Sequence, residues 1–187
     1  MKKIIMMILG VFIVATSAMA KQDGFFVGGQ FSLASIKDEV EAVGYGPVFN
    51  RGGSSLIRAK AAAYVGYKHY ITDSFGLRYY PKFSLGGNYW IVDANADALY
   101  EFTDALGVFA GLGLGMGSGN TVKTWGAEYG INLGGIYTLN SEKMSVELAA
   151  RIGLSKHEET FLRDFKYKSS QPFEVGIRVT IFLDDTF

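Results

Sequence analysis

The sequence contains no cysteine and only three prolines in 187 residues. Small exported domains usually compensate for a modest core with disulfides, so the absence of cysteine excludes a disulfide scaffold and leaves no residue for a lipid anchor. Neither sign of charge dominates, with 18 lysines and arginines against 18 aspartates and glutamates. This balance gives no general attraction to nucleic acid, and no nucleic-acid partner is expected.

Long hydrophobic runs are also missing beyond the first twenty residues. In that segment two lysines precede the apolar run Ile4–Ala15, and Ala18-Met19-Ala20 supplies a small-x-small cleavage pattern. This arrangement predicts a secretory signal peptide over residues 1–20 and a single mature domain over residues 21–187. No later segment has the roughly 20 consecutive apolar residues of a membrane helix.

Glycine and aromatic residues are abundant, with 24 Gly, 14 Phe and 11 Tyr. In Gly107–Asn120 (GVFAGLGLGMGSGN) glycine recurs at almost every second position, with Leu112, Leu114 and Met116 between the glycines. A phosphate-binding loop has its glycines in a turn before a helix, usually followed by Lys and Ser or Thr. Strict alternation instead predicts a strand with one apolar face and one nearly bare face.

Seven further segments alternate in the same way, although the fourth strand of the series is the weakest. Each sets aliphatic and aromatic residues against glycine, polar or charged residues, which is typical of β-strands. Pro81 lies on the apolar face of the third strand and cannot donate a ladder hydrogen bond, which a local bulge would accommodate. The eight predicted strands cover Gly24–Ser35, Ile57–Ile71, Phe75–Trp90, Ala96–Phe102, Gly107–Asn120, Trp125–Leu139, Met144–Ser155 and Phe173–Leu183.

The predicted connections alternate between tight turns and longer segments. Tight hairpin turns are expected at Thr72–Ser74, Thr103-Asp104 and Asn140–Lys143. The other connections are expected at Ile36–Leu56, Ile91–Asn95, Ser118–Thr124 and Lys156–Gln171. In an up-and-down arrangement every tight turn falls at the end that holds both termini, which is the layout of an outer-membrane barrel with its long loops outside the cell.

The polar faces carry charges of both signs, whereas the apolar faces carry no charge in mid-strand. A soluble barrel with its apolar face inward is therefore less favoured than a barrel with apolar residues toward lipid and polar residues inside. Eight strands enclose a space just wide enough for side chains, so these seven bases and four acids are expected to form an interior network, completed by tyrosine, asparagine or water, with the inward glycines leaving room. The predicted network comprises Arg58, Lys60, Lys68, Arg78, Lys82, Glu101, Glu128, Glu147, Arg151, Glu174 and Arg178.

The chain resembles the small eight-stranded outer-membrane barrels of Gram-negative bacteria, of the OmpA transmembrane domain and OmpX type. The most specific part is the last strand, where Gly176, Val179 and Ile181 precede a terminal Phe187. The resemblance implies an all-β, eight-stranded antiparallel transmembrane barrel in the outer membrane, and recognition of those four residues by the barrel-assembly machinery. It also implies contact with outer-membrane lipid and lipopolysaccharide, and a monomer. The spacer Asp184–Thr186 before Phe187 departs from the family pattern.

Signals for catalysis or cofactor binding are weak. The only histidines, His69 and His157, have no metal-ligand spacing such as H-E-x-x-H, so no metal or other cofactor is expected. A non-catalytic role in membrane integrity, or in surface interaction through the loops, is the favoured interpretation. The alternatives are a narrow pore or transporter and, less favoured, a lipid-modifying enzyme that uses His157 with Ser155. Residues expected to make loop contacts are Tyr45, Phe49, Arg51, Phe161, Arg163, Phe165 and Lys166.

Overall fold

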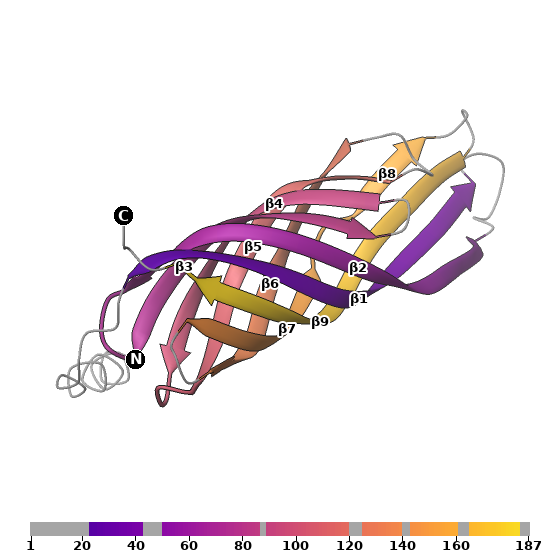
Figure 1. The fold of residues 1–187 in the computed structure, drawn as a ribbon. Helices are drawn as coiled ribbons and strands as arrows, with labels where there is room; N and C mark the ends of the chain where they lie inside the picture. Colours follow the sequence, from indigo (N-terminus) through magenta and orange to yellow (C-terminus); the bar gives the residue numbers. More distant parts are fainter. Residues whose placement is uncertain are drawn as a thin grey trace, which may run out of the picture.

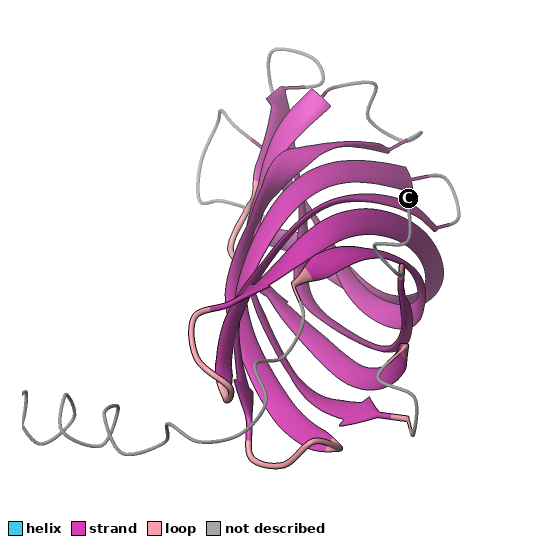
Figure 2. Cartoon of the chain, turned by 60° about the vertical axis from the view of Figure 1, so that its left-hand side comes forward, coloured by secondary structure: helices cyan, strands magenta, loops and turns pink. Residues whose placement is uncertain are grey.

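The protein forms one antiparallel sheet that curls into a barrel (Figure 1, Figure 2). The structure is a computed structural model, and it describes residues 23–42, 50–86, 89–119, 125–139, 143–160 and 165–183. None of these residues forms a helix long and apolar enough to cross a membrane. The strands are β1 (Gly24–Ala42), β2 (Asn50–Tyr70), β3 (Phe75–Gly86), β4 (Tyr89–Glu101), β5 (Leu106–Gly119), β6 (Trp125–Thr138), β7 (Met144–Gly153), β8 (His157–Thr160) and β9 (Phe165–Phe182).

Eight of the described strands build the barrel wall. β1 to β7 pair in chain order, β7 pairs with β9, and β9 pairs with β1 to close the sheet. The short β8 pairs with the first part of β9, on the same edge of β9 as β7, and so continues the line of β7 at the far end of the barrel. The eight-stranded antiparallel barrel predicted from the sequence is confirmed.

The two ends of the barrel differ, as the connections predict. At the end where β1 begins and β9 ends, hereafter the turn end, β2 and β3 are joined by residues 71–74, where the Phe75 amide donates to Thr72 O. β4 and β5 are joined by residues 102–105, where Thr103 Oγ1 accepts from the Leu106 amide at 3.0 Å. At the opposite end, hereafter the loop end, β1, β2 and β9 extend beyond their neighbours (Figure 1).

Three of the predicted connections are wrong in extent. β1 and β2 pair as far as Glu41 and Asn50, so most of Ile36–Leu56 is strand. Much of Lys156–Gln171 is also strand, in β8 and the first part of β9. Consecutive polar residues interrupt the apolar–polar alternation in these segments. A sheet that is surrounded by water needs no apolar face, so the sequence gives no strand signal there.

The third error is the start of the fourth strand. The segment Ile91–Asn95 is the middle of β4, because Gly86 pairs with Tyr89 and only two residues separate the strands. The sequence Gly87-Asn88 is a two-residue hairpin signal. The interpretation overlooked it because the apolar alternation of β3 continues through Tyr89 and Trp90.

Pro81 is accommodated without a bulge. β2 and β3 pair at Tyr64 with Lys82 and at Tyr67 with Tyr79, so equal numbers of residues lie between the two pairs and the register is unchanged. The ladder to β2 is interrupted between these pairs, whereas the ladder to β4 continues through Pro81. The missing amide of the proline therefore costs pairing on one side only.

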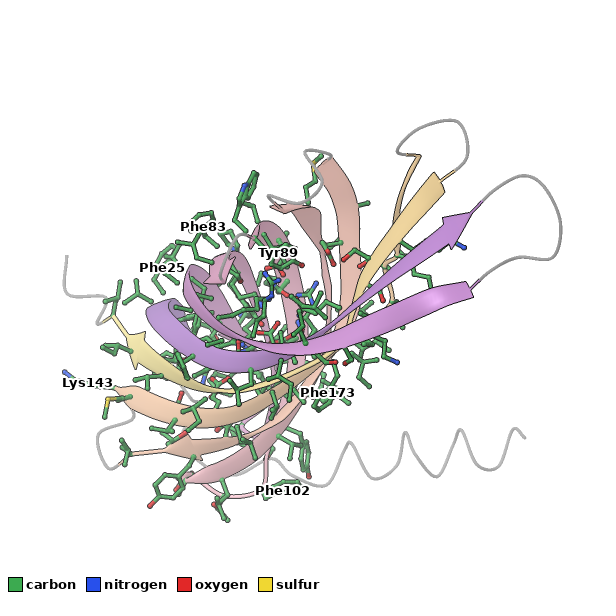
Figure 3. All side chains as sticks on the ribbon, turned by 90° about the vertical axis from the view of Figure 1, so that its right-hand side faces the viewer. Phe25, Phe83, Tyr89, Phe102, Lys143 and Phe173 are labelled. Atoms are coloured by element: carbon green, nitrogen blue, oxygen red, sulfur yellow. The ribbon has the colours of Figure 1, made fainter. Side chains whose placement is uncertain are left out.

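Most apolar side chains of the wall strands point away from the barrel. Phe25, Phe83, Phe102 and Phe173 project from its outer surface (Figure 3) and are between 45% and 62% exposed. Every wall strand contributes exposed apolar residues, including Leu112 and Leu114 on β5 and their equivalents on the other seven. The predicted arrangement, with apolar residues outside the barrel and charged residues inside, is confirmed. A soluble barrel with its apolar face inward is excluded.

Candidate functional site

The centre of the barrel is crossed by Arg78, which extends from β3 to Glu147 on β7, four strands away around the wall. Its terminal nitrogens donate to the two oxygens of Glu147 at 2.5 and 2.9 Å, and its Nε donates to Asp97 at 2.9 Å. These three side chains are at most 5% exposed. Paired guanidinium–carboxylate bonds are among the strongest hydrogen bonds in proteins, so this contact holds opposite walls together.

A second arginine, Arg178 on β9, lies beside the first. Its Nε donates to Gln30 at 2.8 Å, and its Nη1 donates to the Tyr80 hydroxyl at 2.9 Å. The Tyr80 hydroxyl in turn donates to Asp97 at 2.9 Å. Arg178 Nη1 lies 3.8 Å from Asp97 and 3.9 Å from Glu147, so two arginines share two carboxylates.

Nearer the loop end, Glu174 on β9 accepts from four side chains. Lys60 donates at 2.8 Å, and Gln30, Ser32 and Gln171 each donate at 2.7 Å. Both oxygens of this buried carboxylate are occupied, which offsets the loss of its hydration. Because its donors come from the neighbouring strands β9, β1 and β2, the group lies along one side of the lumen.

Asp93 on β4 forms the opposite part of this layer. Arg151 on β7 donates to Asp93 at 2.5 Å, and Lys82 lies 3.7 Å from the same carboxylate. Asn95 donates to Asp93 at 2.8 Å and accepts from Asn132 at 2.9 Å. One carboxylate thus compensates two buried cations, and amides extend the network around the wall.

The network continues to both ends of the lumen. At the loop end Glu128 accepts from Ser155 at 2.6 Å and from the Tyr89 hydroxyl at 3.1 Å. Toward the turn end Lys68 lies 3.4 Å from Glu101. Polar side chains therefore occupy the whole described length of the interior.

The glycines of β5 provide the space for these side chains. A Cβ on Gly111 would overlap the carboxylate of Asp97 and the carbonyl of Ala96. A Cβ on Gly113 would lie 2.5 Å from Asn95 Oδ1 and 2.8 Å from Arg151 Nη1. Real Cβ atoms do not approach other atoms this closely, so the bare face of β5 is where the long side chains of other strands pass.

The interior also holds apolar side chains toward the turn end, which the sequence interpretation missed. Leu99, Phe109 and Ile136 pack together there, and Phe26 packs near Phe182. A small cavity there is lined by apolar residues and also by Lys68, Arg78 and Glu147, and it leaves only about 10 Å³ for the centre of a water molecule, which is room for about one water. Apolar and charged side chains together therefore fill the described lumen at this end.

Most of the predicted network residues lie together in the lumen. Arg58 is the outlier, because it is only half-buried on β2 beyond the Glu174 group. Lys68 is half-buried near the turn end. The buried members are Lys60, Arg78, Lys82, Glu101, Glu128, Glu147, Arg151, Glu174 and Arg178.

Sequence reasoning missed Asp93 and omitted Asp97 from the network, although each lies at the centre of an ion-pair group. Asp93 fell in the segment interpreted as a connection, and Asp97 lay on the polar face of the weakest strand. The signal was present, since Asp93, Asn95 and Asp97 alternate with alanines in β4. The predicted network had seven bases and only four acids. Asp93 and Asp97 add two carboxylates and bring the charges closer to balance.

The predicted loop contacts and assembly signal are only partly described. Arg51 lies on β2, and Phe165 and Lys166 lie on β9, so these three belong to strands and not to loops. In the last strand Gly176 faces the lumen, while Val179 and Ile181 face outward at 38% and 46% exposure. The remaining predicted residues, Tyr45, Phe49, Phe161, Arg163 and Phe187, lie outside the described residues.

Cofactor chemistry finds no support among the described side chains. They contain no group of three His, Cys, Asp or Glu residues that could hold a metal ion. His69 faces outward at the turn end and contacts Asp23, which also accepts from the Tyr70 amide at 2.6 Å. Ser155 donates to Glu128 inside the lumen.

A closed barrel with an apolar exterior and a charged interior is the architecture of an outer-membrane β-barrel protein. The solved structure of the outer membrane protein OprG from Pseudomonas aeruginosa has the same fold, with a TM-score of 0.51 and 12% identity over 88% of this chain and 98% of that one. Neisserial surface protein A is 15% identical over 87% of this chain and 100% of that one, with a TM-score of 0.46. No curated protein matches the sequence.

The family model described as Helicobacter outer membrane protein matches residues 62–187, which is more than half of the chain. The chain therefore belongs to this family, and it is located in the cell outer membrane. The turn end accordingly faces the periplasm and the loop end faces outward. The narrower resemblance to the OmpA and OmpX type stays a prediction.

Proposed function

We propose that the protein is a non-catalytic outer-membrane protein that contributes to membrane integrity and makes contacts outside the cell. The observation that carries this proposal is the lumen, in which charged side chains pair with one another across the barrel. Arg78 is bonded to Glu147 on the opposite wall, and Arg151 is bonded to Asp93 three strands away. Side chains that satisfy each other in this way hold the walls together and leave little capacity to bind a substrate.

The same contacts disfavour a pore. A conducting path would require Arg78 and Glu147 to separate, and breaking a buried ion pair costs about 3–5 kcal/mol. Open aqueous channels belong to barrels of about 16 strands, and eight strands leave room only for side chains. A lipid-modifying enzyme is disfavoured because Ser155 donates to Glu128 in the lumen, away from the lipid-facing surface.

The loop end supports the surface role. β1 and β2 continue as a paired hairpin to Glu41 and Asn50, and β9 continues beside β1 from Phe165. Among the described strands, β2 has no partner on its other side before Ala61, where pairing with β3 begins. This sheet stands beyond the barrel wall and presents backbone hydrogen-bonding groups to the outside.

Two measurements test the proposal. Purified protein in planar lipid bilayers is expected to give no stepwise conductance, and regular steps would establish the pore instead. In cells, a deletion strain is expected to become sensitive to detergents. A variant in which a short turn replaces residues 40–51 should restore resistance if the barrel alone serves integrity, and should fail to restore it if the outer hairpin is required. If neither the deletion nor the shortened hairpin changes the cells, the proposal is wrong.

A further inference from the structure

Two outward-facing lysines lie at the loop end, just beyond the apolar surface. Lys37 on β1 and Lys156, which follows β7, are both exposed. Lys37 pairs in register with Ser170 of β9. On the other side of β9, His157 pairs with Ser169, so extending that register by one residue places Lys156 beside Ser170 as well. The two lysines therefore stand on either side of one strand.

The spacing of the pair suits a shared anion. Neighbouring strands are about 4.8 Å apart, so the two lysine backbones are about 10 Å apart, and their flexible side chains can converge over Ser170. Two hydroxyl groups near Lys37 add hydrogen-bond donors. Ser35 Oγ and Ser55 Oγ lie 3.4 Å apart, and Lys37 pairs in register with Ser55.

The height of the pair on the barrel identifies the kind of ligand. Exposed apolar side chains lie below it, among them Leu33 on β1, Phe173 on β9 and Leu154 after β7, at 48%, 47% and 51% exposure. Such side chains contact acyl chains, so the lysines lie at the level of the lipid headgroups. Phosphates are the anionic groups at that level.

We propose that Lys37 and Lys156 form a binding site for the phosphate groups of the outer-leaflet glycolipid, lipid A, whose acyl chains lie against Leu33, Phe173 and Leu154. The proposal gives a residue-level site to the lipid contact implied by the membrane location. It does not depend on whether the lumen conducts, so failure of the pore test and failure of this one are distinguishable.

The test is native mass spectrometry of the purified protein in detergent micelles, titrated with phosphorylated lipid A. Each lysine near an anionic lipid is expected to contribute about fivefold to affinity, so K37Q/K156Q should bind about 30-fold more weakly and each single variant about fivefold. K143Q, the same change at an exposed lysine at the periplasmic end, should bind like the wild type. Unheated gel mobility verifies that every variant is folded.

Two further arms separate the possible sources of the signal. Lipid A without phosphates should bind wild type and double variant equally weakly, and inorganic phosphate should not compete. The proposal is overturned if K37Q/K156Q keeps the wild-type affinity or if dephosphorylated lipid binds the wild type as tightly. Competition by inorganic phosphate would also overturn it, because the site would then recognise a free anion.

Discussion

Replacing Glu147 by glutamine tests whether ion pairs across the lumen stabilise the barrel. Glutamine keeps the shape of the side chain, which is 1% exposed, but removes the charge that Arg78 contacts through two hydrogen bonds. Arg178 lies 3.9 Å from the same carboxylate and loses part of its compensation as well. The variant therefore leaves two buried arginines with only Asp97 as their shared acid.

The expected cost is about 3–5 kcal/mol of the free energy of unfolding, as for other buried pairs that lose one partner. Combining Glu147→Gln with Arg78→Met leaves Arg178 and Asp97, which are 3.8 Å apart and balance each other. The double variant should therefore be less destabilised than the sum of the two single variants, by about 0.5–3 kcal/mol. Asp104→Asn makes the same chemical change in an exposed turn and should cost at most about 1 kcal/mol, as for other surface contacts.

The measurement is urea unfolding of the protein in lipid vesicles, followed by fluorescence of Trp90 and Trp125 and by unheated gel mobility. A loss below about 1 kcal/mol in Glu147→Gln would show that the network fills space without stabilising the fold. Strict additivity of the double variant would show that the two groups do not interact in the membrane. Either result would refute the reasoning.

Three further expectations concern single positions. Gly111→Ala should lower the free energy of unfolding by about 1–3 kcal/mol in the same assay, because the added Cβ would overlap Asp97. Gly135→Ala is the matched control and should be tolerated, since the nearest atom to its Cβ is 4.0 Å away. Pro81→Ala should add a slowly exchanging amide at position 81 in hydrogen exchange, because the ladder to β2 can then close; unprotected exchange there would contradict this. The pKa of Asp23 is held below its usual 3.8, first by the Tyr70 amide and then by the ring of His69. The stability difference between wild type and Asp23→Asn should therefore be fully present above about pH 4 and be lost as the pH falls through the folded pKa, and a difference independent of pH would contradict it.

The barrel wall could be predicted because membrane and lumen impose opposite chemistry on alternate residues. β5 is the clearest case, since Leu112 and Leu114 face outward at 67% and 66% exposure while Gly111 and Gly113 face the lumen. Where that contrast ends, the prediction fails. The outer parts of β1 and β2 stand beyond the wall, and their residues carry no alternation from which to extend the strands.

The network could be predicted as a set of charges but not as a set of pairs. Which acid meets Arg78 depends on the stagger of the strands around the closed barrel, and that stagger is not encoded in any single segment. Asp93 was lost for a different reason, because a boundary error of a few residues moved it from a strand to a connection. The apolar layer of Leu99, Phe109 and Ile136 was missed because inward positions were expected to be polar throughout.

The near balance of buried acids and bases connects the stability of the barrel with the filling of its lumen. Nine of the eleven predicted charged residues are buried, and Asp93 and Asp97 bring the buried acids of the described residues to six against five buried bases. A nearly neutral interior needs no counter-ions from solvent, so water and salt have no electrostatic reason to enter. Any change that opened a path through the lumen would first have to separate a pair such as Arg78 and Glu147, and that separation also weakens the contact between opposite walls. In this barrel, a pore and a stable wall are therefore competing outcomes of the same interactions.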